Sequence, residues 1–206
     1  MPNWCSTKYI FRGSSNEINY LHRKIAEWTS NSAVQSDFGN DWLGNILYGA
    51  GLGDKVENNE LRCRGTLVEL QDPEDDCLEL WTETAWVPMA KMWDAVIEAL
   101  KLKTVGFAFE AEECGCEIYW IYDPHGYGDF DYDQVYIDAY GSSDLDNISG
   151  YYTEEQAIRQ LNAFLDTNYN ELGNLIKECE TFNEKHEEDD WFISVHRFEF
   201  DNELQD

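Results

Sequence analysis

The segment at residues 7–28 reads TKYIFRGSSNEINYLHRKIAEW and contains two different hydrophobic periodicities. Its first six residues are rich in β-branched and aromatic side chains and end at Gly13, which is typical of a strand. After Gly13 the apolar residues recur at helical spacing, at Ile18, Leu21, Ile25 and Trp28. The pair Ser14 and Glu17 predicts a capping box at the start of this helix. The segment therefore predicts a strand followed by an amphipathic helix.

The next segments complete a longer pattern. Residues 61–70 and 78–84 predict two strands, and the acidic, proline-containing run 71–76 predicts the turn that joins them into a hairpin. Pro88 predicts the first turn of a second helix, and residues 105–111 return to a strand. The order strand, helix, strand, strand, helix, strand is that of the ferredoxin-like split βαβ fold. We therefore expect an α+β protein with an antiparallel sheet and helices on one face.

Other segments predict additions to this sheet. Residues 30–59 predict an ordered, partly helical insertion, and residues 117–122 and 135–140 predict further strands that extend the sheet. Later in the chain, Thr153 and Gln156 form a second capping-box pattern ahead of a helical region with a break near Asn168 or Gly173. A last strand is expected at 191–200. We expect a core at 1–140 and an acidic helix–strand extension at 141–206, packed together as one compact body.

The charge of the chain limits the classes of partner that it can bind. It has 42 acidic and 14 basic residues, and the excess is uneven: net −6 over 1–104 and net −22 over 105–206. Such a field repels nucleic acid and anionic membranes and attracts basic protein clefts. We therefore expect no direct binding to nucleic acid and no membrane association, and we expect a basic protein as the partner.

Acidic residues of the second half form the expected partner-binding face. They are Asp123, Asp129, Asp131, Asp133, Asp138, Asp144, Asp146, Glu187, Glu188, Asp189 and Asp190. Carboxylates on a rigid scaffold can imitate a DNA backbone and occupy the basic groove of a nuclease or another DNA-binding protein. One alternative is an acidic cation-binding protein, although the carboxylates do not follow the EF-hand pattern. The other is an ordinary solvated face that keeps the chain soluble.

A second candidate site combines tryptophan and glutamate. Trp81, Glu83 and Trp86 lie at the end of a predicted strand, and Glu112 and Glu113 end the strand expected to lie nearby. Two carboxylates in an aromatic cleft could act as acid and base, or the cleft could bind a small ligand. The alternative is a core tryptophan cluster with solvated acids at its rim. Without a positioned nucleophile, we expect a non-enzymatic protein and assign no catalytic residue.

The cysteines predict neither disulfides nor a metal site. The chain begins without a signal sequence and contains no long apolar run, so we expect a cytoplasmic protein with six reduced thiols. Cys114-Gly115-Cys116 lacks the two-residue gap and the second cysteine pair of zinc and redox motifs. We therefore expect no metal and no cofactor.

Three stretches resemble a known family. They are Met1-Pro2-Asn3-Trp4-Cys5, the run from Trp81 to Pro88 that reads WTETAWVP, and the run from Phe109 to Glu113 that reads FEAEE. Together they are similar to phage- and plasmid-type proteins with the YubB-like ferredoxin-like domain, over about residues 1–122. The resemblance implies a ferredoxin-like fold and a mobile-element origin. It implies no reaction and no catalytic residues.

Overall fold

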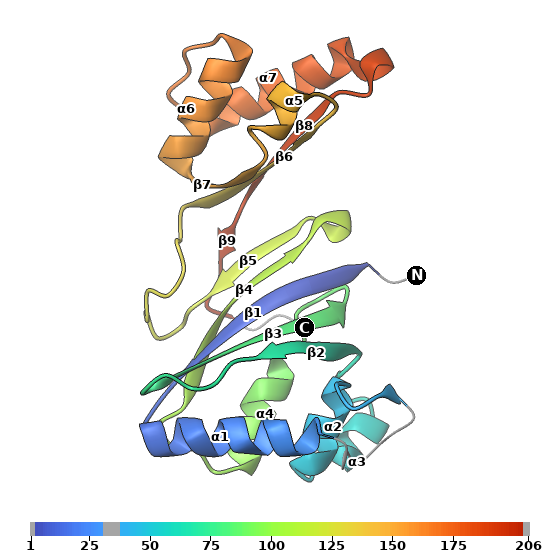
Figure 1. Ribbon diagram of the computed structural model, residues 1–206, viewed down its shortest axis with the longest axis vertical. Coiled ribbons are helices and arrows are strands. Elements are labelled where there is room, and N and C mark those ends of the chain that lie inside the picture. Colours follow the sequence, from blue (N-terminus) through green and yellow to red (C-terminus); the bar gives the residue numbers. More distant parts are fainter. Residues whose placement is uncertain (1–2, 31–37, 204–206) are drawn as a thin grey trace. The chain divides into compact units, whose positions relative to one another are not determined.

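Strand β1 (Trp4–Arg12) is the central strand of a six-stranded sheet in the computed structural model, which describes residues 3–30 and 38–203 (Figure 1). It pairs antiparallel with β3 (Cys77–Ala85) on one side and β4 (Gly106–Glu113) on the other. The sheet has the order β2-β3-β1-β4-β5-β9. The remaining strands are β2 (Gly65–Leu70), β5 (Ile118–Tyr122) and β9 (Glu199–Phe200). The expected hairpin is formed by β2 and β3.

Four helices cover one face of this sheet (Figure 1). They are α1 (Ser15–Trp28), α2 (Leu43–Gly49), α3 (Gly53–Glu57) and α4 (Lys91–Ala99). All four apolar residues that predicted the first helix are buried. Helices α2 and α3 lie in the expected insertion at 30–59, of which residues 31–37 fall outside the described part.

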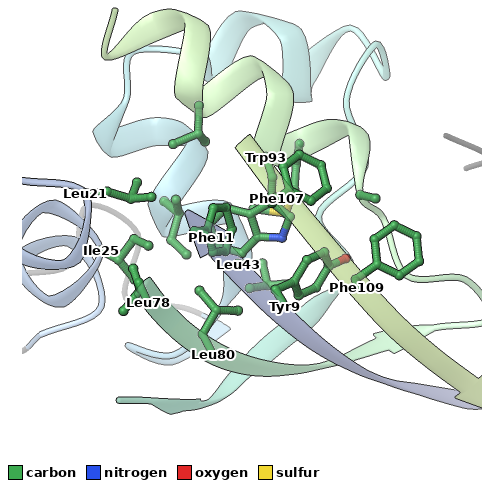
Figure 2. Close-up of a cluster of buried hydrophobic side chains, with 14 of the residues drawn as sticks. Tyr9, Phe11, Leu21, Ile25, Leu43, Leu78, Leu80, Trp93, Phe107 and Phe109 are labelled. Atoms are coloured by element: carbon green, nitrogen blue, oxygen red, sulfur yellow. The ribbon is translucent and has the colours of Figure 1, made fainter. Parts of the chain in front are cut away.

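The core between sheet and helices is aromatic. Rings from β1, β4 and α4 pack at centroid distances of 5.2 to 6.2 Å, with Tyr9 and Phe11 at the centre. Figure 2 labels Tyr9, Phe11, Leu21, Ile25, Leu43, Leu78, Leu80, Trp93, Phe107 and Phe109, all of them buried in one cluster. Each such side chain contributes roughly 1.5–3 kcal/mol when it leaves water. This cluster fixes the helices on the sheet.

Two local predictions are wrong. Ser14 makes no side-chain cap bond with α1, and its backbone N–H donates to the Thr104 hydroxyl rather than to Glu17. The Glu17 carboxylate instead accepts hydrogen bonds from the backbone N–H groups of Lys103 and Thr104 and from the Thr104 hydroxyl, the last at 2.6 Å. The second helix begins at Lys91 rather than Pro88. Met89 has a left-handed backbone (φ 55°), which a helix cannot contain, so the helix starts after it.

The chain divides into two compact units. Unit 1 contains the described residues up to Phe130 and from Phe200 onward, and unit 2 spans Asp131–Glu199. Unit 2 has its own sheet, with the order β7-β6-β8, and its longer helices α6 and α7 lie on one face of that sheet (Figure 1). Its elements are β6 (Gln134–Tyr140), α5 (Ser143–Asp146), β7 (Gly150–Thr153), α6 (Glu154–Leu165), α7 (Leu172–Lys185) and β8 (Phe192–Arg197).

The expected strand at 135–140 exists as β6, but it does not extend the first sheet. It pairs with β7 and β8 over a separate buried cluster that includes Val135, Ile137 and Leu161. The boundary between the units therefore falls at residue 131, ten residues before the expected extension begins. The capping box of Thr153 and Gln156 is confirmed, and the break in the helical region lies at Asp166, which is left-handed.

Within the described residues, none of the helices combines the length and apolarity needed to cross a bilayer. The expected α+β class is confirmed: the described part of the chain contains two sheets and seven α-helices.

We predict that Glu17→Gln makes the protein less stable at pH 7 but not at acid pH. Hydrogen bonds from the Thr104 hydroxyl and from the backbone N–H groups of Lys103 and Thr104 hold the pKa of Glu17 below its usual value of 4.5. A carboxylate with a lowered pKa stabilises the fold above its unfolded pKa, and that contribution is lost as the pH falls through the folded pKa. Thermal unfolding followed by circular dichroism, in steps down from pH 7, should show the gap in Tm closing below pH 4.5.

The matched control is Glu60→Gln, which removes an exposed glutamate that precedes β2. Its Tm should follow that of the wild type across the whole pH range. A Glu17→Gln gap that persists unchanged into acid would contradict the role assigned to the Glu17 carboxylate.

Candidate functional site

Three of the five residues of the expected cleft lie on the sheet face of unit 1 that the helices leave uncovered. Glu83 and Glu112 both pair with Ser6, one from each side, so the three side chains share a face. Trp81 lies on β3, two residues before Glu83, and pairs with Lys8 of β1. The Lys8 ammonium binds the Glu79 carboxylate at 2.8 Å and lies 5.1 Å from the Trp81 ring centroid.

The other two residues of the expected cleft lie elsewhere. Glu113 points to the opposite face from Glu112, because successive side chains of a strand alternate. It is buried, and its carboxylate accepts hydrogen bonds from the backbone N–H groups of Gly115 and Cys116. Trp86 follows the end of β3, beyond the sheet face. The structure therefore brings together Trp81, Glu83 and Glu112, but not the full set of five.

The buried thiols are unsuited to nucleophilic chemistry. Burial raises the pKa of Cys5 and of Cys179 to about 12 and that of Cys63 to about 11. A thiol with such a pKa is protonated near neutral pH and reacts poorly. Cys114 and Cys116 are exposed and free. Within residues 3–30 and 38–203, no three His, Cys, Asp or Glu side chains are grouped so that they could hold a metal ion.

Two residues of the expected acidic face serve the fold of unit 1. Asp123 is only 2% exposed, and its carboxylate accepts hydrogen bonds from the backbone N–H groups of Tyr127 and Gly128 at 3.0 and 2.9 Å. Asp129 binds Arg12 through both of its oxygens, at 2.8 and 2.5 Å. These carboxylates shape the loop after β5 and are not available to a partner. Asp123 and Asp129 therefore do not belong to a partner-binding face.

The remaining acids of that face belong to unit 2, where most of them are exposed and form two groups. The β6-start group consists of Asp131 and Asp133, just before β6. The α5–η3 group consists of Asp144 and Asp146 in α5 and of Glu187, Glu188, Asp189 and Asp190 in and after the 3₁₀ turn Glu187–Asp189. Asp138 lies between the two groups on β6 and is half-buried.

The backbone explains why the α5–η3 group is compact. The last residue of β6, Tyr140, pairs with the first residue of β8, Phe192, so the chain segments after β6 and before β8 meet at one end of the sheet. Gly141 adopts φ 118°, and a Cβ atom there would lie 2.8 Å from the Asp190 carbonyl oxygen. Only glycine permits this approach. The β6-start group lies at the opposite end of β6.

The arginines of unit 2 do not neutralise the acids of these two groups. It has 17 acidic and 4 basic residues, a net charge of −13. Its two arginines are bound to glutamates of α6: Arg197 to Glu154 at 2.9 Å and Arg159 to Glu155 at 3.8 Å. Among the two groups, the Asp189 carboxylate forms a hydrogen bond with Nδ1 of His186 at 2.9 Å. The surface of unit 2 is therefore strongly negative at both ends of its sheet.

A site that the sequence analysis missed lies in unit 1, and we name it the aromatic pocket. It is bordered by the start of β2, the end of β3 and the segment before α2. The side chains that define it are Trp4, Phe38, Trp42, Arg62, Arg64 and Trp86. The signal present in the sequence was the pair Arg62 and Arg64 at the start of the strand predicted at 61–70, in a chain that is otherwise acidic. Trp86 is the residue that the aromatic pocket shares with the expected cleft.

In comparisons with known proteins, no family model, no curated protein and no solved structure matched the chain. The resemblance to YubB-like proteins therefore stays a prediction. The activities that the chain can support are argued below from its own residues.

We predict that Glu113→Gln accelerates alkylation of Cys116. The hydrogen bond with the Glu113 carboxylate raises the pKa of Cys116, since it favours the protonated thiol. Removing that negative charge increases the thiolate fraction, which is the reactive form. Iodoacetamide labelling at mildly alkaline pH, followed by peptide mass spectrometry, should show Cys116 reacting several times faster in the variant.

Cys114 is the internal control, since it is also exposed and belongs to the same 3₁₀ turn. If both thiols accelerate equally, the turn has opened and the charge effect is not the cause. If neither changes, Glu113 does not control the reactivity of Cys116.

Proposed function

We propose that the chain is a non-enzymatic accessory protein whose unit 2 binds a basic protein. The observation that carries this proposal is the exposure of the β6-start and α5–η3 groups on a unit of net charge −13. The arginines of unit 2 are occupied by α6, so the two groups keep their charge for a partner. A surface of this kind steers a positively charged partner toward it.

The partner we propose is a nucleic-acid-handling protein with a basic groove. The two acid groups are separated by the length of β6, whose seven residues span roughly 20 Å at about 3.3 Å per residue. Carboxylates held at both ends of a rigid strand can contact a groove at two points, as phosphates of a duplex do. Competition with DNA for that groove would inhibit the partner, for example a nuclease of a host defence system.

We also propose that unit 1 is a ferredoxin-like domain of the YubB-like type and that the protein originates from a phage or another mobile element. The support for the fold is the order β2-β3-β1-β4 of its first four strands, with α1 and α4 packed on one face. The support for the origin is the resemblance of the opening pentapeptide and of the segment Trp81–Pro88. An accessory role against a host nuclease agrees with such an origin.

Of the two alternative functions, ligand binding has independent support, namely the aromatic pocket of unit 1. Cation binding has less, because the described carboxylates include no three that could share one metal ion. The alternative of an enzyme would need more than the exposed Glu83 and the half-buried Glu112 on either side of Ser6.

The test uses the immobilised full-length chain and a bacterial lysate freed of nucleic acid. We expect a DNA-binding protein to be retained, to be displaced by a short DNA duplex, and to lose at least tenfold in affinity between about 50 and 200 mM salt, the range over which phosphate-type contacts weaken. Charge-neutralising variants of either group, Asp131→Asn with Asp133→Asn or Asp144→Asn with Asp146→Asn, should retain less of it. Mass spectrometry of each salt fraction identifies the partner.

The control variant, Glu60→Gln with Glu98→Gln, removes two exposed charges from unit 1 and should retain the partner fully. Retention that is insensitive to salt and to duplex DNA would overturn the proposal. Equal losses in the control and in the unit 2 variants would show that net charge acts without a defined surface.

A further inference from the structure

The aromatic pocket of unit 1 has the size of a small-molecule site. Its volume is about 730 Å³, within the range of roughly 300–1,000 Å³ that is usual for ligand pockets. Its wall combines the start of the edge strand β2 with Trp42, which forms an isolated bridge with Thr66 of that strand. The far side is the turn that follows β3.

Exposed aromatic side chains gather at this pocket. Trp4, Phe38 and Trp86 are 50%, 66% and 45% exposed, and all three line it. Phe38 also packs on Trp42 at a centroid distance of 4.6 Å. Single exposed apolar side chains are common on protein surfaces, but several large ones exposed next to each other mark an interaction site.

The turn that carries Trp86 is held in a strained conformation. Trp86 and Met89 have φ angles of 69° and 55°, in the left-handed region that large side chains avoid. Three hydrogen bonds maintain the turn: Trp86 N–H to the Asn3 carbonyl at 2.9 Å, the Tyr9 hydroxyl to the Pro88 carbonyl at 2.5 Å, and the Thr84 hydroxyl to the Val87 carbonyl at 2.6 Å. Strain kept by its surroundings is characteristic of functional sites. The backbone at Trp86 is therefore held in place before any ligand arrives.

The charge of the pocket is opposite to that of the chain. One residue in five of the chain is acidic, yet the residues that line the pocket include no Asp or Glu and two arginines, Arg62 and Arg64. Neither arginine forms an ion pair with a carboxylate in the described part of the chain. The Arg64 guanidinium lies 4.8 Å from the Trp86 ring centroid. Two exposed guanidinium groups without carboxylate partners are suited to bind an anion.

We propose that the aromatic pocket binds a small molecule in which a flat aromatic ring is joined to a carboxylate or phosphate. The ring would stack between the indoles of Trp42 and Trp86, and the anionic group would accept hydrogen bonds from Arg62 and Arg64. An aromatic acid and a mononucleotide share this chemistry. The site lies in unit 1 and does not depend on the acid groups of unit 2.

The experiment is isothermal titration of the full-length protein with paired probes. The first pair is 2-naphthoate and its neutral analogue 2-naphthalenemethanol, and the second is AMP and adenosine. We expect the anionic member of at least one pair to bind about tenfold tighter or more, the factor that a hydrogen bond to a charged group supplies. Preference in the first pair alone indicates an aromatic acid, and preference in the second indicates a nucleotide.

Two variants and a matched control locate the site. Arg62→Gln with Arg64→Gln should bring the two members of the preferred pair to nearly equal affinity. Arg23→Gln should leave the preference intact, although Arg23 also stacks on an aromatic ring, that of Tyr20 in α1 at 5.4 Å. Trp86→Gly, at a backbone conformation that glycine adopts without strain, should lose binding of both members.

Equal affinity of the neutral and the anionic probes would overturn the proposal and would indicate an apolar anchor site for a protein partner. Absence of binding to all four probes by folded wild-type protein would also overturn it. The same holds if Trp86→Gly, or the double arginine variant, binds as the wild type does. Loss of the acid groups of unit 2 should not change any of these affinities, which separates this outcome from that of the proposed function.

Discussion

The pairing of β1 with β3 and β4 is the contact on which unit 1 depends. It places Tyr9 and Phe11 at the centre of the aromatic core, where their rings meet those of Trp93 and Phe107. It also carries Tyr9 to the turn after β3, whose Pro88 carbonyl accepts its hydroxyl hydrogen bond. The same strand therefore holds the core together and fixes the wall of the aromatic pocket. Damage to the core would therefore also reach that pocket, whose lining includes Cys63 of the same buried cluster.

The two units offer surfaces of opposite charge to a binding partner. Unit 2 presents carboxylates at both ends of its sheet, whereas the aromatic pocket of unit 1 presents two arginines and no acid. At physiological salt the field of distant charges decays over about 8 Å, so the net charge of the chain repels an anion only weakly once the anion is close. The arginines then act at short range. A negatively charged protein can in this way hold an anionic ligand and a cationic partner on different surfaces.

Local patterns predicted the elements well, and contacts distant in sequence decided what remained. The buried face of α1, the β2–β3 hairpin and the capping box of α6 follow from neighbouring residues, and all three are confirmed. The true partners of Glu17 are Lys103 and Thr104, more than 80 residues away, and no local pattern contains them. The separation of Glu112 from Glu113 was available from strand alternation alone. The aromatic pocket was not, because Trp42, Arg64 and Trp86 come from three segments that meet only in the folded unit.

Strand β9 joins the first sheet beside β5, but in the chain it comes after all of unit 2 except Glu199, its own first residue. During synthesis the 68 residues from 131 to 198 are therefore made between the first unit and β9. Until then β5 is an open sheet edge, and an open edge is a template for pairing with another nascent chain. Its sequence, Ile118 to Tyr122, is wholly apolar or aromatic and offers no charge against such pairing. The time that the chain takes to synthesise unit 2 thus bears on how much of the protein escapes aggregation.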